Sequence, residues 1–260
     1  MRGFPNYLLP LWMGLLWSLA GCRSSSPQSS VYPVRYTAEV DWPKGKSLEQ
    51  LKDFPVGGLN HPEIGIEGIA MNKGSDTNLV TARSWREFCR FSEAGYEPAD
   101  NANLVMSGWF VKKRGYIPFL EKARPCTISY VHELPLNWQL LKELPIDLGP
   151  LISDQQIEQA REATKGGKFW IDFFPAMKIT KCTKTMMELE GGGDSVRMRV
   201  MAYGDYNHDG YEDVLLYVAY EATEGTLGFA HTVALTRTGP HQPLREVGQL
   251  ENSEMAPVSH

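Results

Sequence analysis

The last third of the chain has the hydrophobic pattern of β-structure. Runs rich in Val, Tyr, Met and Phe are bounded by Gly, Asn and Asp, which predicts successive strands. The expected strands are 168–174, 177–189, 195–203, 213–221 and 228–237. The Gly-Gly-Gly-Asp sequence at 191–194 supplies a hairpin turn. Because the connections are short, we expect these strands to pair as an antiparallel β-meander.

Helix signals lie before this region. Ser153 with Gln156 three residues later is typical of a helix N-terminus, and Gly166-Gly167 ends the segment, which predicts a helix over 154–165. Ser84 and Glu87 have the same spacing and open a shorter helix over 85–92. Residues 118–122 are expected to form one helical turn.

Weaker patterns predict three further strands: 31–42, interrupted at Pro33, then 103–112 and 127–132. Residues 53–78 are rich in Gly and Pro and are expected to form loops with short strands. The fold class that follows is α+β, with small helices and a C-terminal antiparallel β-meander. We expect one globular domain over 31–250 and a disordered tail over 251–260.

The N-terminus departs from this globular pattern. Arg2 precedes an apolar stretch over 7–20, which is 14 residues long and contains Pro10. A membrane-spanning helix needs about 20 apolar residues. The stretch therefore predicts a secretory signal peptide over 1–21.

The end of this stretch, Leu19-Ala20-Gly21-Cys22, resembles the lipobox of bacterial lipoproteins. The resemblance covers the first 22 residues. It implies that the Cys22 thiol carries a diacylglycerol, that the chain is cut before Cys22, and that the new amine is acylated by a fatty acid such as palmitate. Two or more acyl chains would anchor the protein stably to a membrane. An ordinary signal peptide with a chance cysteine is the alternative.

Residues 22–30 then comprise the lipidated cysteine and a polar, flexible tether. Arg23 stands where many enterobacterial lipoproteins of the inner membrane carry Asp. This favours the outer membrane, facing the periplasm, with the inner membrane or the cell surface as alternatives. The chain has 26 basic and 31 acidic side chains, a net charge of −5. Since phosphate-binding proteins usually carry a basic excess, nucleic acid is not an expected partner.

Three cysteines remain besides Cys22, namely Cys89, Cys126 and Cys182. The exported compartment is oxidising, so two of the three are candidates for a disulfide. The sequence does not select the pair. Three free thiols that pack as small apolar side chains are the alternative.

One motif carries candidate chemistry. Residues 205–213 place oxygen-bearing side chains at positions one, three, five and nine of a short loop, and Tyr211 can offer its backbone carbonyl at position seven. The four side chains are Asp205, Asn207, Asp209 and Asp213. Calcium takes about six to eight oxygen ligands in flexible geometry, so this spacing predicts a calcium site.

The loop is not expected to be an EF-hand, because Leu216 stands where the bidentate Glu of that motif belongs and a strand follows. It resembles the integrin-like calcium loop of FG-GAP repeats, DxDxDGxxD between β-strands, with Asn207 in place of the second Asp. The resemblance is local and implies a structural calcium ion. Such repeats build a propeller from several copies, and this chain has one copy. A metal-free Asp/Asn/Gly turn is the alternative.

No HExxH or GxSxG motif is present, and His132-Glu133 is interpreted as a surface pair. We therefore expect a non-enzymatic binding or accessory module of the bacterial envelope with a protein partner, for example a toxin-immunity or inhibitor protein. The alternative is an envelope hydrolase whose active site forms only in the folded chain.

Overall fold

The computed structural model of the chain describes residues 31–40, 42–43, 45–55, 68–74, 78–223 and 228–249. The predictions for the signal peptide 1–21, for the segment 22–30 with Cys22, and for the tail 251–260 lie outside these residues.

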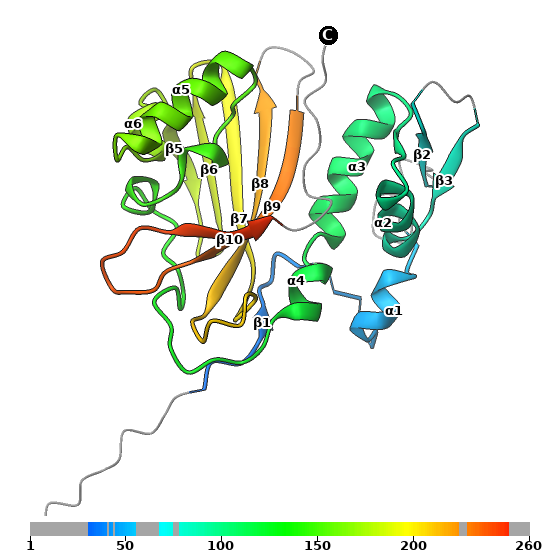
Figure 1. The fold of residues 1–260 in the computed structure, drawn as a ribbon, viewed down its shortest axis with the longest axis horizontal. Coiled ribbons are helices and arrows are strands. Elements are labelled where there is room, and N and C mark those ends of the chain that lie inside the picture. Colours follow the sequence, from blue (N-terminus) through cyan, green and yellow to red (C-terminus); the bar gives the residue numbers. More distant parts are fainter. Residues whose placement is uncertain are drawn as a thin grey trace, which may run out of the picture. The chain divides into compact units, whose positions relative to one another are not determined.

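The main sheet has seven antiparallel strands (Figure 1). Its order is β10-β9-β8-β7-β6-β5, and β1 pairs with β7 off this path. The strands are β1 (Arg35–Tyr36), β5 (Lys178–Cys182), β6 (Met186–Gly191), β7 (Asp194–Gly204), β8 (Asp213–Ala222), β9 (Gly228–Thr236) and β10 (Arg245–Gln249). Because β5 to β10 are neighbours in chain order, the predicted C-terminal meander and the α+β class are confirmed.

The predicted turn at 191–194 is also present. It joins β6 to β7 through Gly192 and Gly193, whose φ angles are 66° and 91°. Both central residues of a type I′ hairpin turn need positive φ, which glycine adopts without steric cost. This turn fixes the register in which Leu189 pairs with Val196.

A smaller sheet and most of the helices come from the first half of the chain. The sheet has the order β3-β2-β4, formed by β2 (Ile69–Asn72), β3 (Val80–Ala82) and β4 (Glu97–Pro98). The helices are α1 (Leu48–Lys52), α2 (Trp85–Glu93), α3 (Asn101–Arg114), α4 (Ile117–Lys122), α5 (Asp154–Lys165) and α6 (Trp170–Phe173), with 3₁₀ turns at Leu140–Lys142 and Ile146–Leu148. Among the described residues, none of the helices has the length and apolar character that crossing a membrane requires.

Hydrophobic side chains pack on both faces of the main sheet. Successive residues of a strand point to opposite faces, and β8 is buried over Asp213–Tyr220 because both of its faces are covered. One face packs against Leu141, Leu144 and Trp170. The other face packs against α3 and α4 through Phe110, Ile117 and Phe119. In Figure 1, α5 and α6 lie on one side of the sheet, and α3 and α4 on the other.

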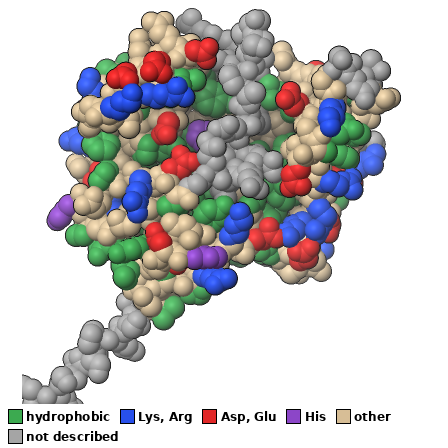
Figure 2. All heavy atoms as spheres, in the orientation of Figure 1, with side chains coloured by type: hydrophobic (Ala, Val, Ile, Leu, Met, Phe, Trp, Pro, Cys, Tyr) green, Lys and Arg blue, Asp and Glu red, His purple; other side chains and the backbone are tan. Residues whose placement is uncertain are grey.

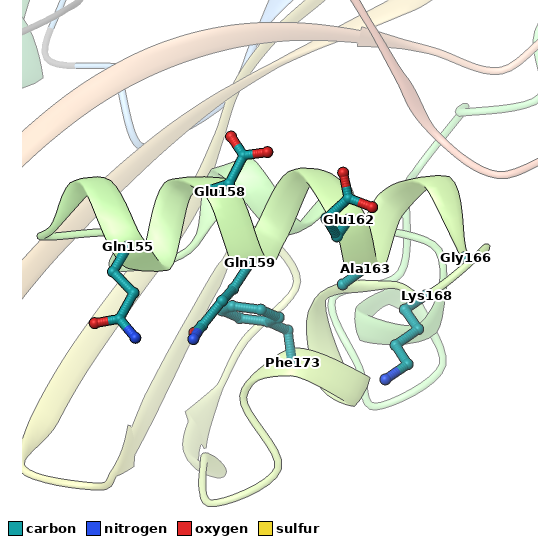
Figure 3. Close-up of a pocket in the computed structure, with 8 residues that line it drawn as sticks. All are labelled: Gln155, Glu158, Gln159, Glu162, Ala163, Gly166, Lys168 and Phe173. Carbon is teal, nitrogen blue, oxygen red and sulfur yellow. The ribbon is translucent and has the colours of Figure 1, made fainter.

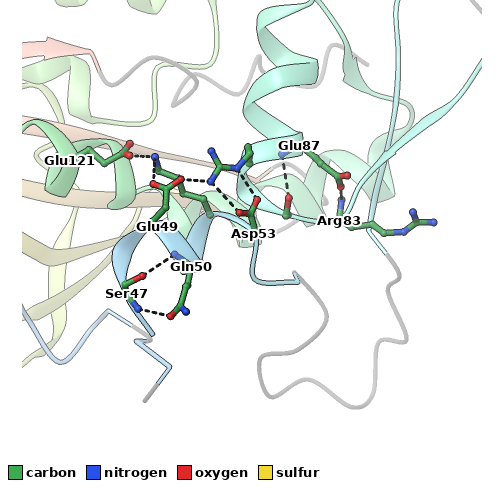
Figure 4. Close-up of polar contacts among 10 residues, drawn as sticks. Ser47, Glu49, Gln50, Asp53, Arg83, Glu87 and Glu121 are labelled. Atoms are coloured by element: carbon green, nitrogen blue, oxygen red, sulfur yellow. Dashed lines mark hydrogen bonds and ion pairs between the residues drawn. The ribbon is translucent and has the colours of Figure 1, made fainter. Parts of the chain in front are cut away.

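Ion pairs join α1, α2 and α4 at the surface (Figure 4). The Arg86 guanidinium of α2 donates to Asp53 at 2.7 Å and to Glu49 at 2.5 Å. Lys52 pairs with Glu49 and with Glu121 of α4. Hydrogen bonds from Arg86 lower the pKa of both Glu49 and Asp53. Since these side chains are exposed, solvent screening keeps the stabilisation small.

The helix predictions are confirmed: 154–165 coincides with α5, and the predicted helices at 85–92 and 118–122 are α2 and α4. The strand prediction for 103–112 is wrong, because these residues belong to α3. Asp100 caps α3 by accepting a hydrogen bond from the Asn103 backbone N–H. The helix contacts both β9 and the smaller sheet. Because α3 is covered on two sides, most of its surface is apolar rather than only one face. Its sequence therefore reads as a continuous hydrophobic run, which cannot be distinguished from a buried strand by its pattern.

Other strand predictions also need correction. Residues 168–174 contain α6, whose start is held by the Phe169 N–H donating to Asp172. The predicted strand 177–189 is divided into β5 and β6 by a turn in which the Thr183 hydroxyl accepts from the Thr185 and Met186 N–H groups. Residues 127–132 form an isolated bridge rather than a strand. The strand predicted over 31–42 is reduced to the two residues of β1.

Candidate metal centre

The 205–213 loop joins the two long strands β7 and β8. Gly204 ends β7 opposite Asp213, the first residue of β8. Strands therefore flank the loop on both sides, as the integrin-like pattern requires and as an EF-hand does not. Gly210 has φ of 90° and His208 has φ of 64°, so the backbone turns sharply twice within the loop.

The oxygen-bearing side chains of the loop turn inward onto its own backbone. Asp205 Oδ1 accepts from the Asp209 N–H at 3.1 Å, and Asp205 Oδ2 accepts from the Gly210 N–H at 2.9 Å. Asp209 Oδ1 accepts from the Tyr211 N–H at 3.0 Å, and Asn207 Oδ1 accepts from the Asp209 N–H at 3.1 Å. The side chains that predicted the site are thus brought together in one compact loop.

Asp213 closes the loop from its far end. Its Oδ2 accepts from the Tyr206 N–H at 2.7 Å and from the Asn207 N–H at 3.4 Å. Its Oδ1 is buried and has no hydrogen-bond partner. Burial raises the pKa of Asp213 to about 6, although the neighbouring Thr236 hydroxyl and the two backbone donors act in the opposite direction. Thr236 faces Asp213 across β8 and β9, and its Oγ1 also lacks a hydrogen bond of normal geometry.

The loop does not form a closed set of metal ligands. In the part of the chain that the structure describes, no three His, Cys, Asp or Glu side chains converge as a metal-binding group. The loop nevertheless fits a cation by charge. Asp205 is 5% exposed and Asp213 is fully buried, and within the described residues no Lys or Arg forms an ion pair with Asp205, Asp209 or Asp213. Buried carboxylates usually need such a charge.

The loop contains a further buried carboxylate, Glu212, that sequence reasoning missed. Glu212 is fully buried and forms an ion pair with Arg35 of β1. The Ser129 hydroxyl donates to Glu212 Oε2 at 2.6 Å, and His132 Nδ1 lies 3.7 Å from the same oxygen. The Arg35 guanidinium also stacks on the Tyr203 ring at 4.0 Å. His132 is exposed, as expected, but it is not isolated, because it lies against Arg35 and Glu212.

Backbone hydrogen bonds tie the loop to the segment that follows α4. The Arg124 and Asp205 backbones exchange two hydrogen bonds of 2.9 Å, and the Glu212 N–H donates to the Ile128 carbonyl at 2.8 Å. Tyr32 and Cys126 exchange two more, of 2.8 and 3.1 Å. The loop is thus the meeting point of the β7–β8 hairpin, the 124–132 segment and the start of the domain.

The structure describes Cys89, Cys126 and Cys182, and none of them forms a disulfide. Cys126 is buried, Cys89 is half-buried and Cys182 is exposed. Burial, with a smaller contribution from Glu212, raises the pKa of the Cys126 thiol to about 11. Cys126 is therefore a protonated, unreactive thiol at neutral pH.

An open groove of about 620 Å³ runs along α5, away from the loop (Figure 3). Gln155, Gln159 and Phe173 line it together with Lys168. Glu158 and Glu162 also border the groove, and each pairs with a basic residue of α5 itself. The groove therefore has charged side chains at its border, of which Glu158 and Glu162 are already paired within α5.

Comparisons with protein-family models, with curated proteins and with solved structures found no match for the chain.

We predict that Asp213→Asn stabilises the calcium-free protein at neutral pH. The ordinary pKa of Asp is 3.8 and the folded value is about 6. The charge of Asp213 therefore destabilises the fold in full above pH 6, and the penalty declines as the pH falls from 6 towards 3.8. The amide keeps an acceptor for the Tyr206 N–H and offers Thr236 a donor. Chemical unfolding in chelator near pH 7.5 should show a gain of about 1–3 kcal/mol.

The difference between the two proteins should shrink towards pH 5. Desolvation lowers the pKa of His231 to about 4, which makes both proteins less stable as the pH falls from 6.5, but this contribution cancels in the comparison. An Asp213→Asn variant that is less stable than the original chain at pH 7.5 would contradict an uncompensated charge at this position.

Proposed function

We propose that this chain is a bacterial envelope lipoprotein, held to a membrane by lipid on Cys22. Its domain would act as a calcium-braced, non-enzymatic binding or accessory module. The lipobox-like sequence at 19–22 supports the anchor. The outer membrane, facing the periplasm, is the favoured location because Arg23 follows Cys22.

One observation connects the proposed anchor with the calcium loop. The described domain begins at Val31, and its first residues contact the 205–213 loop through the Arg35–Glu212 ion pair. An ion bound by Asp205, Asn207, Asp209, Tyr211 and Asp213 would therefore brace the place where the tether joins the fold. Its role would be structural, because it would neutralise carboxylates that have no cationic partner among the described residues.

We favour a domain that binds a protein partner in the envelope, for instance as a toxin-immunity or inhibitor protein. An exposed aromatic side chain supports a binding surface, since Trp138 is 43% exposed.

The cluster of Ser129, His132 and Glu212 makes an envelope hydrolase the second candidate. These are residue types of nucleophilic catalysis, but their order differs from a catalytic triad. The Ser129 hydroxyl donates to Glu212 rather than to His132, and Glu212 is already neutralised by Arg35. In this geometry His132 does not activate Ser129, and we therefore place hydrolysis second.

The anchor is tested by Cys22→Ala. We expect this variant to keep residues 1–21, to lose its acyl chains in intact-mass measurement, and to leave the detergent phase on phase separation. Cys182→Ala, which removes an exposed thiol, is the matched control and should remain lipidated. Lipid on the Cys22→Ala variant, or an unmodified native chain beginning at Met1, would refute the anchor.

Calcium binding is tested by thermal unfolding after treatment with chelator. Extracellular sites bind calcium at about 0.1–1 mM, so about 1 mM calcium should stabilise by about 0.4–1.4 kcal/mol. For a domain of this size, that corresponds to a rise in melting temperature of about 1–5 °C. Asp209→Ala should abolish the rise, whereas Asp154→Ala in α5 should retain it. If calcium raised the melting temperature equally in the Asp209→Ala and Asp154→Ala variants, the ion would be binding at another site.

Purification from detergent-solubilised envelope distinguishes the two candidate functions. We expect a stoichiometric protein partner, and we expect Ser129→Ala to retain it. The opposite result would be the absence of a partner together with turnover of cell-wall or lipid substrates that Ser129→Ala abolishes. That outcome would replace the binding module with a hydrolase.

A further inference from the structure

Three exposed hydrophobic side chains lie at the end of the domain where the described chain begins. Seven large hydrophobic side chains are exposed among the described residues. Three of them form what we call the tether-end patch: Val31, 62% exposed, Ile128, 41% exposed, and Tyr130, 37% exposed. Figure 2 shows hydrophobic side chains around the start of the described chain.

Backbone and ring contacts hold these residues in one region. Tyr32, next to Val31, pairs with Cys126, two residues before Ile128. Ile128 forms a bridge with Tyr211, and the Tyr130 ring stacks on the Tyr211 ring at a centroid distance of 6.1 Å. The patch thus borders the 205–213 loop.

The length of the preceding chain limits how far this end can lie from the anchor. Eight residues, 23–30, separate Cys22 from Val31. Fully extended, they span at most about 28 Å, and a flexible chain of this length has a typical end-to-end distance of about 15 Å.

We propose that the tether-end patch rests on the phospholipid bilayer into which the lipid of Cys22 inserts. This inference depends on the proposed anchor and adds the orientation of the domain. The tether brings this end of the domain, before any other, within reach of the lipid headgroups.

The side chains at this end suit a headgroup surface. Tyrosine is enriched at membrane interfaces because its ring is apolar and its hydroxyl is polar. Lys122 and Arg124 are exposed beside the patch and attract anionic headgroups. The neighbouring Glu133 is paired with Lys184 at 2.9 Å. Asp209 is an exposed acid of the same region, and calcium in the loop would neutralise it.

A patch of three side chains binds a bilayer weakly by itself. A short tether changes this, because it holds the patch near the surface at an effective concentration in the millimolar range. The contact is therefore a property of the anchored protein and has to be measured on it.

The test uses the full-length, lipidated protein in phosphatidylethanolamine–phosphatidylglycerol vesicles that contain nitroxide-labelled lipid. In a Cys182→Ser background, an environment-sensitive fluorophore is attached to Ile128→Cys or to Ile152→Cys. The two isoleucines are 41% and 42% exposed. Ile152 lies two residues before α5 in the chain, and α5 lies away from β1 in Figure 1. The parent Cys182→Ser protein corrects for labelling of the other thiols.

We expect a blue-shifted emission at position 128 and quenching by nitroxide lipid several-fold stronger than at position 152. Tyr130→Cys should report the same contact if Ile128→Cys does not fold. Equal quenching at positions 128 and 152, in protein that floats with the vesicles, would overturn the orientation and leave the anchor standing. Protein that does not float would overturn both. Shielding of position 128 by a bound protein instead of lipid would also overturn the orientation.

Discussion

Two adjacent carboxylates, buried at the start of β8, constrain how this end of the molecule is built. Glu212 and Asp213 are both fully buried, and an ionised carboxylate is costly to bury without a partner. Glu212 is compensated by Arg35 and by the Ser129 hydroxyl. Asp213 has two backbone donors but no cation of the described chain. The first carboxylate therefore ties β1 and the 124–132 segment to the hairpin loop, whereas the second has no charged partner within the described chain.

The ladder between β7 and β8 gives this arrangement its rigidity. The two strands pair from Asp194–Ala222 at one end to Gly204–Asp213 at the other, and side chains of β8 are buried on both faces of the sheet. The 124–132 segment has no such support of its own and is held by isolated bridges to Tyr32, Asp205 and Tyr211. Its position depends on the hairpin loop, so an ion that fixes the loop would also fix this segment.

The sequence predicted the elements whose ends carry local signals. Ser153, Gln156 and Gly166 define α5, and the glycines at 191–193 define the turn from β6 to β7. It failed for α3, where a helix covered on two sides lacks the polar face that marks most helices. The loop 205–213 was found because its residues are neighbours in the chain. The Arg35–Glu212 pair was missed because 177 positions separate its members, and spacing carries no information about such a contact.

The contacts made by the first residues of the domain also determine how mechanical tension on the N-terminus would be transmitted to the sheet. A pull on the N-terminus first reaches the two hydrogen bonds between Tyr32 and Cys126 and then the Arg35–Glu212 pair. The hydrophobic layers on either side of the main sheet lie behind these contacts. Under such tension, the start of the chain with β1 would peel away from the hairpin loop while β5 to β10 stayed paired, and the N-terminal segment would lengthen without loss of the meander.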